Sequence, residues 1–460
     1  MLEKILSKID SSLDANIEHL FDFLRIASIS TDSNYSSECE KAANWLVEDL
    51  STIGFKAQAC KTKLHPIVLA HYMGETDSDF HVLFYGHYDV QPVDPLELWH
   101  HDPFDPQIKL INGHKAIVAR GASDDKGQVM TFIEACRAYH NEYGRLPVKV
   151  TIMIEGEEEM GSPSLDAFFE QYKDQLKADV VLVCDTSMRD RETPSITTSL
   201  RGGVAEEIII HAANRDLHSG EYGGIAANPI NILTKICGEL KDENGRILLD
   251  GFYDAVPDMP QEIVDSWLKL EKESPNPLTQ IGLSEVAGEK GYSLTELLWS
   301  RPSLDITGIT GGYTGEGFKT VIASEAKVKI SCRLVGKQDP DKIRASLRKF
   351  FEERLPKDCS ISYINHGGSP AVFLPTDSPI LKKVQNALGD EWNGRQALLS
   401  GCGASIPIVG DFQKYLGLDS LLVGYALSDD AIHSPNEKYD LASFHKGQRA
   451  WARILSVLSV

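Results

Sequence analysis

Five short runs of apolar, largely β-branched residues constrain the fold of this chain more than any other feature. Stretches with helical periodicity separate them, and each run has the length of a strand. Continuous apolar runs of this kind are typical of strands buried on both faces of a parallel sheet. The sequence therefore predicts an α/β domain with a mostly parallel sheet between helices. The runs occupy residues 81–85, 116–119, 148–154, 180–184 and 421–423.

An amphipathic helix is predicted ahead of these runs, at residues 37–55. Ser37 and Glu40 have the spacing of a capping box, and Gly54 can end the helix. Ala43, Leu46, Val47 and Leu50 form the apolar stripe of this helix.

The middle of the chain has a different pattern. Two segments alternate polar and apolar residues, as half-exposed strands do, and two others have helical periodicity. We expect a small α+β sandwich with one solvated face, inserted into the larger domain, and a mostly helical excursion at residues 241–305. The expected bounds are 1–197 and 373–460 for the two parts of the larger domain and 198–372 for the insertion. The strands are expected at 204–211 and 327–335, and the helices at 228–240 and 341–355, the last with Asp339 as its cap and Pro340 at its first position.

Composition excludes several classes of partner. The formal net charge is −21, from 67 acidic and 46 basic residues, which argues against nucleic acid and anionic membranes. No apolar run approaches the roughly 20 residues that span a bilayer, and the N-terminus lacks the pattern of a signal peptide. The eight cysteines are scattered along the chain. We therefore expect a cytoplasmic protein with reduced thiols.

Residues of the types that bind metal ions follow the apolar runs. The carboxyl ends of strands in an open α/β sheet gather at one crevice, so five separate segments would deliver two histidines and several carboxylates to one place. Buried charges need partners or a cation. The segments carry His87 and Asp89, Asp124 and Asp125, Glu157 to Glu159, Asp185, and His433.

The chemistry of this set favours zinc, with cobalt or manganese as substitutes, because it combines imidazole and carboxylate without thiolate. Two histidines and three carboxylates are too many for one tetrahedral ion. They suit two ions about 3.5–4 Å apart that share a carboxylate. Asp89 would accept a hydrogen bond from the His87 ring and orient it.

Each segment alone has a simpler explanation. His87 and Asp89 could form an ordinary hydrogen bond, and the Asp124–Asp125 pair could cap a helix. The acidic run at Glu157–Glu159 could be a solvated loop. The prediction of a metal centre therefore depends on the conjunction of five segments at strand ends.

These motifs resemble the two-zinc family of aminoacylase, acetylornithine deacetylase and carboxypeptidase G, and most of all its carnosinase-type cytosolic dipeptidases. The resemblance runs over nearly the whole chain. It implies a catalytic zinc domain with an inserted lid or dimerisation domain, and hydrolysis of dipeptides or very short peptides. The matching stretches are YGHYDVQPVDPLELWHHDPFDP, ARGASDDKGQ, EGEEEMGS, RDLHSG, KTVIAS, CRLV, HGGSP and HSPNEKY.

The resemblance also implies a role for each metal ligand. Asp124 would bridge two zinc ions, and the Asp124–Asp125 peptide would be cis. One ion would take His87 and Asp185, and the other would take Glu159 and His433. Glu158 would be the general base that accepts a proton from the attacking water.

Further roles are implied for residues of the inserted domain. His218 would stabilise the oxyanion from the partner subunit of a homodimer, with Thr320 reaching the same site. Arg333 would bind the terminal carboxylate of the substrate, although a strand arginine can also pair at the surface. His366 and Ser405 match further substrate contacts.

One departure from the family leaves the substrate open. The carnosinase-like branch usually reads Arg-Glu-Gly-Gly-Ser where this chain has Gly401, Cys402, Gly403, Ala404 and Ser405. We interpret Cys402 as lining rather than a metal ligand or a reactive thiol. An N-acyl amino acid deacylase with the same metals is an alternative, and a non-catalytic binding or scaffold protein is a second.

Overall fold

The computed structural model describes residues 1–273, 276–403 and 406–460. They form two compact units, and the second is inserted into the first. The first unit comprises Met1–Thr198, Leu374–Ser400 and Pro407–Val460, and the second comprises Ser199–Phe373 and Gly401–Ile406.

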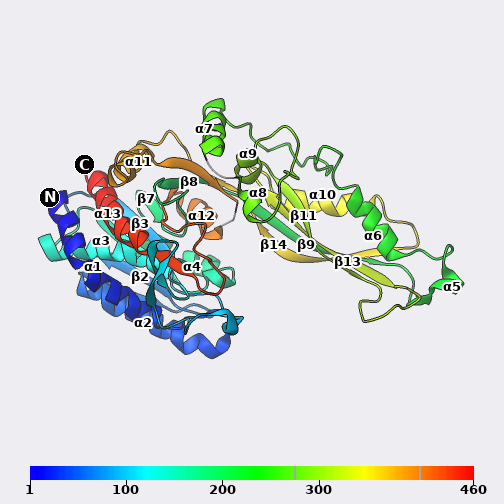
Figure 1. Ribbon diagram of the computed structural model, residues 1–460, viewed down its shortest axis with the longest axis horizontal. Coiled ribbons are helices and arrows are strands. Elements are labelled where there is room, and N and C mark those ends of the chain that lie inside the picture. The colour runs from blue at the N-terminus through cyan, green and yellow to red at the C-terminus, as the bar shows by residue number, and fades with distance from the viewer. Residues whose placement is uncertain (274–275, 404–405) are drawn as a thin grey trace. The chain divides into compact units, whose positions relative to one another are not determined.

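The first unit contains a nine-stranded sheet whose four central strands are parallel. The strands on either side of this centre are antiparallel to it. This is the predicted α/β architecture, with a mostly parallel central sheet (Figure 1). The central strands are β6 (Lys149–Glu155), β3 (His81–His87), β7 (Val180–Val183) and β17 (Ser420–Leu422); β1 (Phe55–Cys60), β2 (Ile67–Tyr72), β8 (Ser195–Leu200), β15 (Val372–Phe373) and β16 (Leu398–Cys402) complete the sheet.

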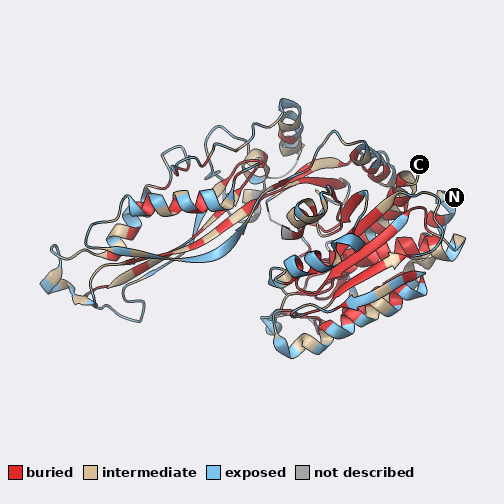
Figure 2. Cartoon of the chain, turned by 180° about the vertical axis from the view of Figure 1, so that it is seen from behind, coloured by how far each residue is buried: buried red, intermediate tan, exposed pale blue. Residues whose placement is uncertain are grey.

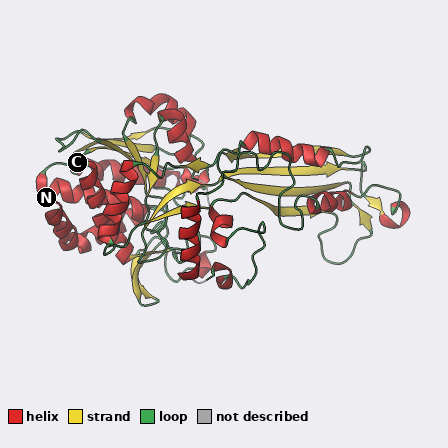
Figure 3. Cartoon of the chain, turned by 90° about the horizontal axis from the view of Figure 1, so that it is seen from above, coloured by secondary structure: helices red, strands yellow, loops and turns green. Residues whose placement is uncertain are grey.

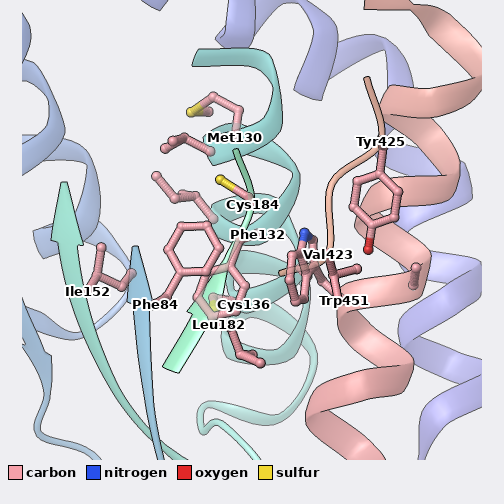
Figure 4. Close-up of a cluster of buried hydrophobic side chains, with 14 of the residues drawn as sticks. Phe84, Met130, Phe132, Cys136, Ile152, Leu182, Cys184, Val423, Tyr425 and Trp451 are labelled. Carbon is pink, nitrogen blue, oxygen red and sulfur yellow. The ribbon is translucent and has the colours of Figure 1, made fainter. Parts of the chain in front are cut away.

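Both faces of this sheet are covered, which explains the unbroken apolar runs. Figure 2 shows its central strands almost entirely in the colour of buried residues. On one face Phe84 stacks on Phe132, with ring centroids 3.8 Å apart, and Trp451 meets both rings edge-on (Figure 4). On the other face Tyr85 contacts Phe412. The helices of the first unit are α1 (Leu2–Leu24), α2 (Ser36–Thr52), α3 (Lys126–Tyr143), α4 (Leu165–Tyr172), α11 (Pro379–Glu391), α12 (Pro407–Asp411) and α13 (Leu441–Leu458).

Two local predictions need correction in the first unit. The run at residues 116–119 is not part of the central sheet; it lies in β5 (His114–Val118) of a separate antiparallel sheet with β4 (Gln107–Ile111) and β18 (Lys438–Asp440). Helix α2 has no side-chain cap, so Ser37 does not form the predicted capping box. Gly54 does follow the helix with a φ of +87°, as expected of a residue that ends one.

The second unit contains a four-stranded antiparallel sheet in the order β11-β13-β9-β14. Helices α6 and α10 pack on one face, while Ile306, Ile309 and Ile364 remain 41%, 51% and 44% exposed. Asp339 caps α10 and Pro340 begins it, as predicted. Figure 3 shows the long strands of this unit. Its elements are β9 (Gly202–His211), β10 (Leu217–His218), α5 (Ser219–Tyr222), α6 (Pro229–Gly238), α7 (Gln261–Glu273), α8 (Pro277–Gln280), α9 (Leu294–Trp299), β11 (Ser303–Gly311), β12 (Val321–Ile322), β13 (Glu325–Leu334), α10 (Pro340–Glu352) and β14 (Ser360–Ser369).

The excursion at residues 241–305 is not mostly helical. In the described part of that segment, α7, α8 and α9 are separated by turns and irregular chain. Prolines and glycines interrupt the helical periodicity there, which explains why the helices are short. Among the described residues, no helix is both long enough and apolar enough to cross a membrane.

A charged cluster joins three helices of the first unit. The His19 ring of α1 bonds to Asp49 of α2 at 3.1 Å and to Glu134 of α3 at 2.7 Å, and Arg137 pairs with both carboxylates. Burial alone would lower the pKa of His19, but the hydrogen bonds to Asp49 and Glu134 raise that pKa from 6.5 to about 9. The protonated ring is therefore the form that stabilises the fold.

We predict that His19→Gln destabilises the protein in a pH-dependent way. Because the folded pKa lies above the unfolded one, the stabilisation is fully present below pH 6.5 and is lost as pH rises through 9. Urea unfolding of the wild type and the variant at pH 6 and pH 10 measures the difference. The exposed His114→Gln serves as control, and a His19→Gln deficit that does not change with pH would contradict the prediction.

Candidate metal centre

Three of the predicted ligand segments lie where parallel strands end. His87 is the last residue of β3 and pairs in register with Glu155, the last residue of β6. The acidic turn Glu158–Met160 follows β6, and Asp185 lies two residues beyond β7. These strands are neighbours and run in the same direction, so their carboxyl ends bring the segments together as predicted.

Asp124 reaches the same place from the start of helix α3. It precedes Asp125, which lies at the N-cap position but forms no side-chain cap bond, so the capping interpretation is wrong. The Asp125 carboxylate instead accepts the backbone N–H of His87 at 3.1 Å and lies 3.3 Å from the Cys184 sulfur. The peptide between Asp124 and Asp125 is cis, as the resemblance implies.

A glycine allows this close approach. A Cβ atom on Gly86 would lie 2.7 Å from the Asp125 carboxylate and 2.5 Å from Val129. Only a residue without a side chain lets β3 pass the start of α3 at this point, immediately before His87.

His433 lies in a loop after the central sheet has ended, not at a strand end. It follows β17 by more than ten residues and precedes β18, with a left-handed φ of +62°. His433 follows the strand predicted at 421–423, but a loop separates the two. The pairing of β18 with β5 explains its position, because that pairing brings the loop beside the segment that contains Asp124.

The five predicted ligands form two groups that share one carboxylate. His87, Asp124 and Asp185 form one group, and Asp124, Glu159 and His433 form the other; within each group the potential ligand atoms lie within 4.8 Å of one another. One Asp124 oxygen is 3.0 Å from His87 Nε2, and the other is 2.9 Å from His433 Nε2. The geometry is that of two adjacent cation sites with Asp124 between them.

The charges at this place are unbalanced without a cation. Burial raises the pKa of Glu158 to about 9 and that of Asp185 to about 7, with neighbouring carboxylates adding to the shift. Hydrogen bonds to Asp124 and Glu159 raise the pKa of His433 to about 10. Burial alone would raise the pKa of Asp124, but hydrogen bonds from His433 and His87 hold it below its usual range. More carboxylates than cationic partners therefore gather here, and a divalent ion would complete the set.

Asp89 does more than the sequence predicted. The His87 ring nitrogen Nδ1 bonds to the backbone carbonyl of Asp89 at 3.1 Å and lies 3.4 Å from its carboxylate. That carboxylate also accepts the hydroxyl of Ser30 at 2.6 Å and the backbone N–H groups of Glu158 and Glu159 at 3.3 and 3.0 Å. Asp89 thus fixes the acidic turn as well as the histidine.

Two further polar contacts at the centre were not predicted. The Gln91 side chain donates to the Glu159 carboxylate at 2.8 Å, and the Tyr85 hydroxyl donates to Glu155 at 2.8 Å. Burial and the charge of Asp89 raise the pKa of Glu155 to about 8. Gln91 and Tyr85 flank His87 within one motif, and their side chains show no metal-binding chemistry that could have indicated these contacts.

The remaining predicted residues belong to the second unit. His218 lies in β10 and is exposed, and the N–H that follows it, of Ser219, bonds to the Thr320 carbonyl at 3.1 Å. Arg333 lies near the end of β13, opposite Gly203 of β9. His366 contacts Glu207 at 3.2 Å. Ser405 lies outside the described residues.

The backbone of Gly401, where the sequence departs from the family pattern, lies close to neighbouring side chains. A Cβ atom on Gly401 would lie 2.6 Å from the Trp299 side chain and 2.9 Å from the Ser199 hydroxyl. The arginine of the usual family pattern could not occupy this position unless Trp299 moved.

A protein-family model, described as peptidase family M20/M25/M40, matches residues 83–457. The chain belongs to this family. It is 32% identical to the Cys-Gly metallodipeptidase DUG1 of Candida albicans, over 97% of this chain and 95% of the relative. It is 27% identical to the human Beta-Ala-His dipeptidase, over 98% of this chain and 92% of the relative.

Solved structures agree with this membership. The structure of the dipeptidase Dug1p from Saccharomyces cerevisiae matches with a TM-score of 0.81 and 27% identity, over 100% of this chain and 98% of that one. The resemblance to carnosinase-type dipeptidases is thereby confirmed. The two relatives are named a metallodipeptidase and a dipeptidase, so this M20 peptidase is an enzyme that hydrolyses peptide bonds.

Proposed function

We propose that this M20 peptidase hydrolyses dipeptides or very short peptides with two divalent metal ions, most suitably zinc, with manganese or cobalt as substitutes. The observation that carries the proposal is the sharing of Asp124 between two groups of ligands. His87 and Asp185 would hold one ion, and Glu159 and His433 would hold the other. Nitrogen and oxygen donors without thiolate suit these metals.

The proposed chemistry is a single attack by water. When bound, the two ions would supply Lewis-acid activation of a water molecule and of the scissile carbonyl. Glu158 accepts the proton of that water and passes it to the leaving amine as the C–N bond breaks. Burial and nearby carboxylates raise the pKa of Glu158 to about 9 without a cation at the site, and bound cations would lower that pKa, so that the ionised carboxylate could accept a proton.

Arg333 is the proposed ligand of the substrate's terminal carboxylate. In the described part of the chain it forms no ion pair, although its β13 position is only half-buried. Opposite it, Gly203 has no side chain, and a Cβ there would meet one atom at 3.8 Å, so room for an anion remains on that face. A guanidinium without a partner suits bidentate binding of a carboxylate. His366 and Ser405 are proposed as further substrate contacts.

His218 is proposed to act in the site of a partner subunit, which would make the enzyme a homodimer. Ser324, which immediately precedes β13, bonds to Asp216 and Ala212, and β10 pairs with β12 nearby. His218 and Thr320 therefore lie at the end of the second unit's sheet where β13 begins. Arg333 lies eight residues beyond Glu325, the first residue of β13, which is roughly 26 Å along the strand at 3.3 Å per residue. One substrate molecule of dipeptide size cannot span that distance, so we infer that the two residues of a single chain serve different sites.

The relatives support the dipeptide as the substrate class. Two of them are named for hydrolysis of Cys-Gly and of Beta-Ala-His. We also retain a cytoplasmic location as a proposal, supported by buried thiols such as Cys39 and Cys136 that form no disulfide. No comparison favours the deacylase alternative.

We predict that the purified protein hydrolyses Cys-Gly or Ala-Ala, loses this activity with a chelator, and regains it with zinc, manganese or cobalt. Liquid chromatography of the released amino acids measures turnover, with N-acetylornithine as the comparison substrate. Faster release of acetate than of amino acids from dipeptides would favour the deacylase. Turnover that survives complete removal of the metal would contradict the proposal.

We predict that Glu158→Gln lowers kcat by about 10²–10⁴-fold, the usual contribution of a general base, while two metal ions remain bound. Elemental analysis gives the metal content, and steady-state kinetics gives kcat. Glu170→Gln, a change of an exposed glutamate on α4, is the matched control. If Glu158→Gln retains most of the turnover, the base must be another residue.

We predict that inactive Glu158→Gln and His218→Ala protomers complement each other. In a mixed dimer with shared sites, one of the two sites contains both native residues, so about half of the wild-type turnover should return. A different affinity tag on each variant allows purification of the mixed dimers. The homodimer of each variant alone is the control and should stay inactive. Purified mixed dimers without activity would exclude the sharing of sites.

A further inference from the structure

Glu437 is a fully buried carboxylate that binds no proposed metal ligand side chain but holds the backbone around one of them. Its Oε1 accepts the N–H groups of Ser123 and Asp124 at 2.9 and 3.0 Å. Its Oε2 accepts the N–H of Gly121 at 3.0 Å and Nη1 of Arg120 at 2.7 Å. The residue is 0% exposed. Four donors from one segment of five residues therefore converge on one side chain.

The pairing of two short strands places Glu437 there. Lys438 of β18 pairs with Val118 of β5, and the N–H of Ala119 bonds to the Glu437 carbonyl at 3.1 Å. Glu437 thus lies immediately before β18, beside the segment that follows β5 and contains Asp124. The contact joins parts of the sequence more than 300 residues apart.

A carboxylate suits this position better than any other side chain. It offers acceptors only, and here three backbone N–H groups and a guanidinium all donate. Arg120 balances the charge: it is 1% exposed, and its second nitrogen Nη2 donates to the Pro92 carbonyl at 2.9 Å. A buried carboxylate with this many donors is held in one orientation.

A second carboxylate anchors the other end of the same loop. The Ser123 hydroxyl donates to Asp430 at 2.8 Å, and Lys438 Nζ donates to Asp430 at 2.7 Å. Glu437 therefore binds the backbone of residues 121–124, and Asp430, at the other end of residues 430–437, binds the Ser123 side chain of the same segment. His433 lies between these anchors and contacts Asp124 at 2.9 Å.

We propose that Glu437 is a positioning residue that sets the distance between Asp124 and His433, and so the affinity of the centre for its metal ions. The inference rests on the proposed function, since it concerns the same two-metal site. Glu437 holds the backbone of the shared carboxylate, and its own chain continues into the loop of the histidine. Outer residues that orient metal ligands typically change metal affinity about 10–100-fold when substituted.

The decisive substitution is Glu437→Gln. The new amide would present N–H donors to Gly121 or Arg120, which also donate, so the segment of Asp124 would lose part of its support. We expect Zn²⁺ to bind the metal-free variant about 10–100-fold more weakly than the wild type. Added metal should restore kcat toward the wild-type value with KM little changed, because the substrate contacts are untouched.

A matched control distinguishes positioning from simple stabilisation. Glu206 is also buried and accepts two arginines, Arg344 at 2.9 Å and Arg348 at 2.8 Å, but it lies in the second unit. Glu206→Gln should lower the melting temperature and leave the Zn²⁺ affinity within about twofold of wild type, because Glu206 contacts none of the proposed ligands.

The measurement is competition for Zn²⁺ between the metal-free full-length protein and a chromophoric chelator, with melting temperatures in parallel. Weaker Zn²⁺ binding by Glu437→Gln alone supports the proposal. If the wild type takes up two ions and Glu437→Gln binds Zn²⁺ as tightly as the wild type does, the positioning proposal is overturned and the proposed function stays intact. A wild type that takes up no metal overturns both.

The variant Arg120→Met/Glu437→Gln covers the case in which the single variant does not fold. It removes both charges of the buried pair, which costs less than removing one, and it still weakens the support of Asp124. Its Zn²⁺ affinity should fall by a similar factor. Wild-type affinity in this folded double variant would overturn the proposal.

Discussion

The structure of the first unit depends on one electrostatic constraint, the concentration of carboxylates around His87 and His433. Asp124 contacts both histidines, and burial raises the pKa values of Glu158 and Asp185 nearby. Such a cluster is unfavourable unless cations complete it, because each charge loses its hydration. The close approach at Gly86 and the left-handed backbone of His433 both serve to bring these groups together.

The sequence predicts best those parts of the site that depend on local order. Strands β3, β6 and β7 could be recognised because burial on both faces leaves unbroken apolar runs, and in a parallel sheet their ends must converge. The run at residues 116–119 has the same composition, yet it pairs with β18 in another sheet. Composition shows that a strand is buried but not which strand pairs with it, so the route by which Asp124 and His433 meet could not be predicted.

The second unit shows a different limit. Helix α10 was predictable from Asp339 and Pro340, because a capping side chain and a first-position proline act within one turn. The distance between His218 and Arg333 depends on the register of β13 over its whole length, and no local pattern encodes that register. The strand acts as a rigid spacer. The proposed catalytic role of His218 at one end of β13 and the proposed carboxylate-binding role of Arg333 at the other are compatible only if each residue serves a different site.

Asp89 and Glu437 explain why a count of acidic residues could not identify the ligands. Both are buried, both lie within motifs that also contain a metal-binding type of residue, and both use their oxygens mainly on backbone N–H groups. A carboxylate that holds a loop and a carboxylate that binds an ion have the same sequence signature, because each is an acceptor with a full negative charge. The two kinds of carboxylate differ only in what their oxygens face, backbone N–H groups in one case and the other candidate metal ligands in the other. The candidate metal centre therefore combines two kinds of carboxylate: those whose oxygens gather in the two ligand groups, and those that hold the backbone around them.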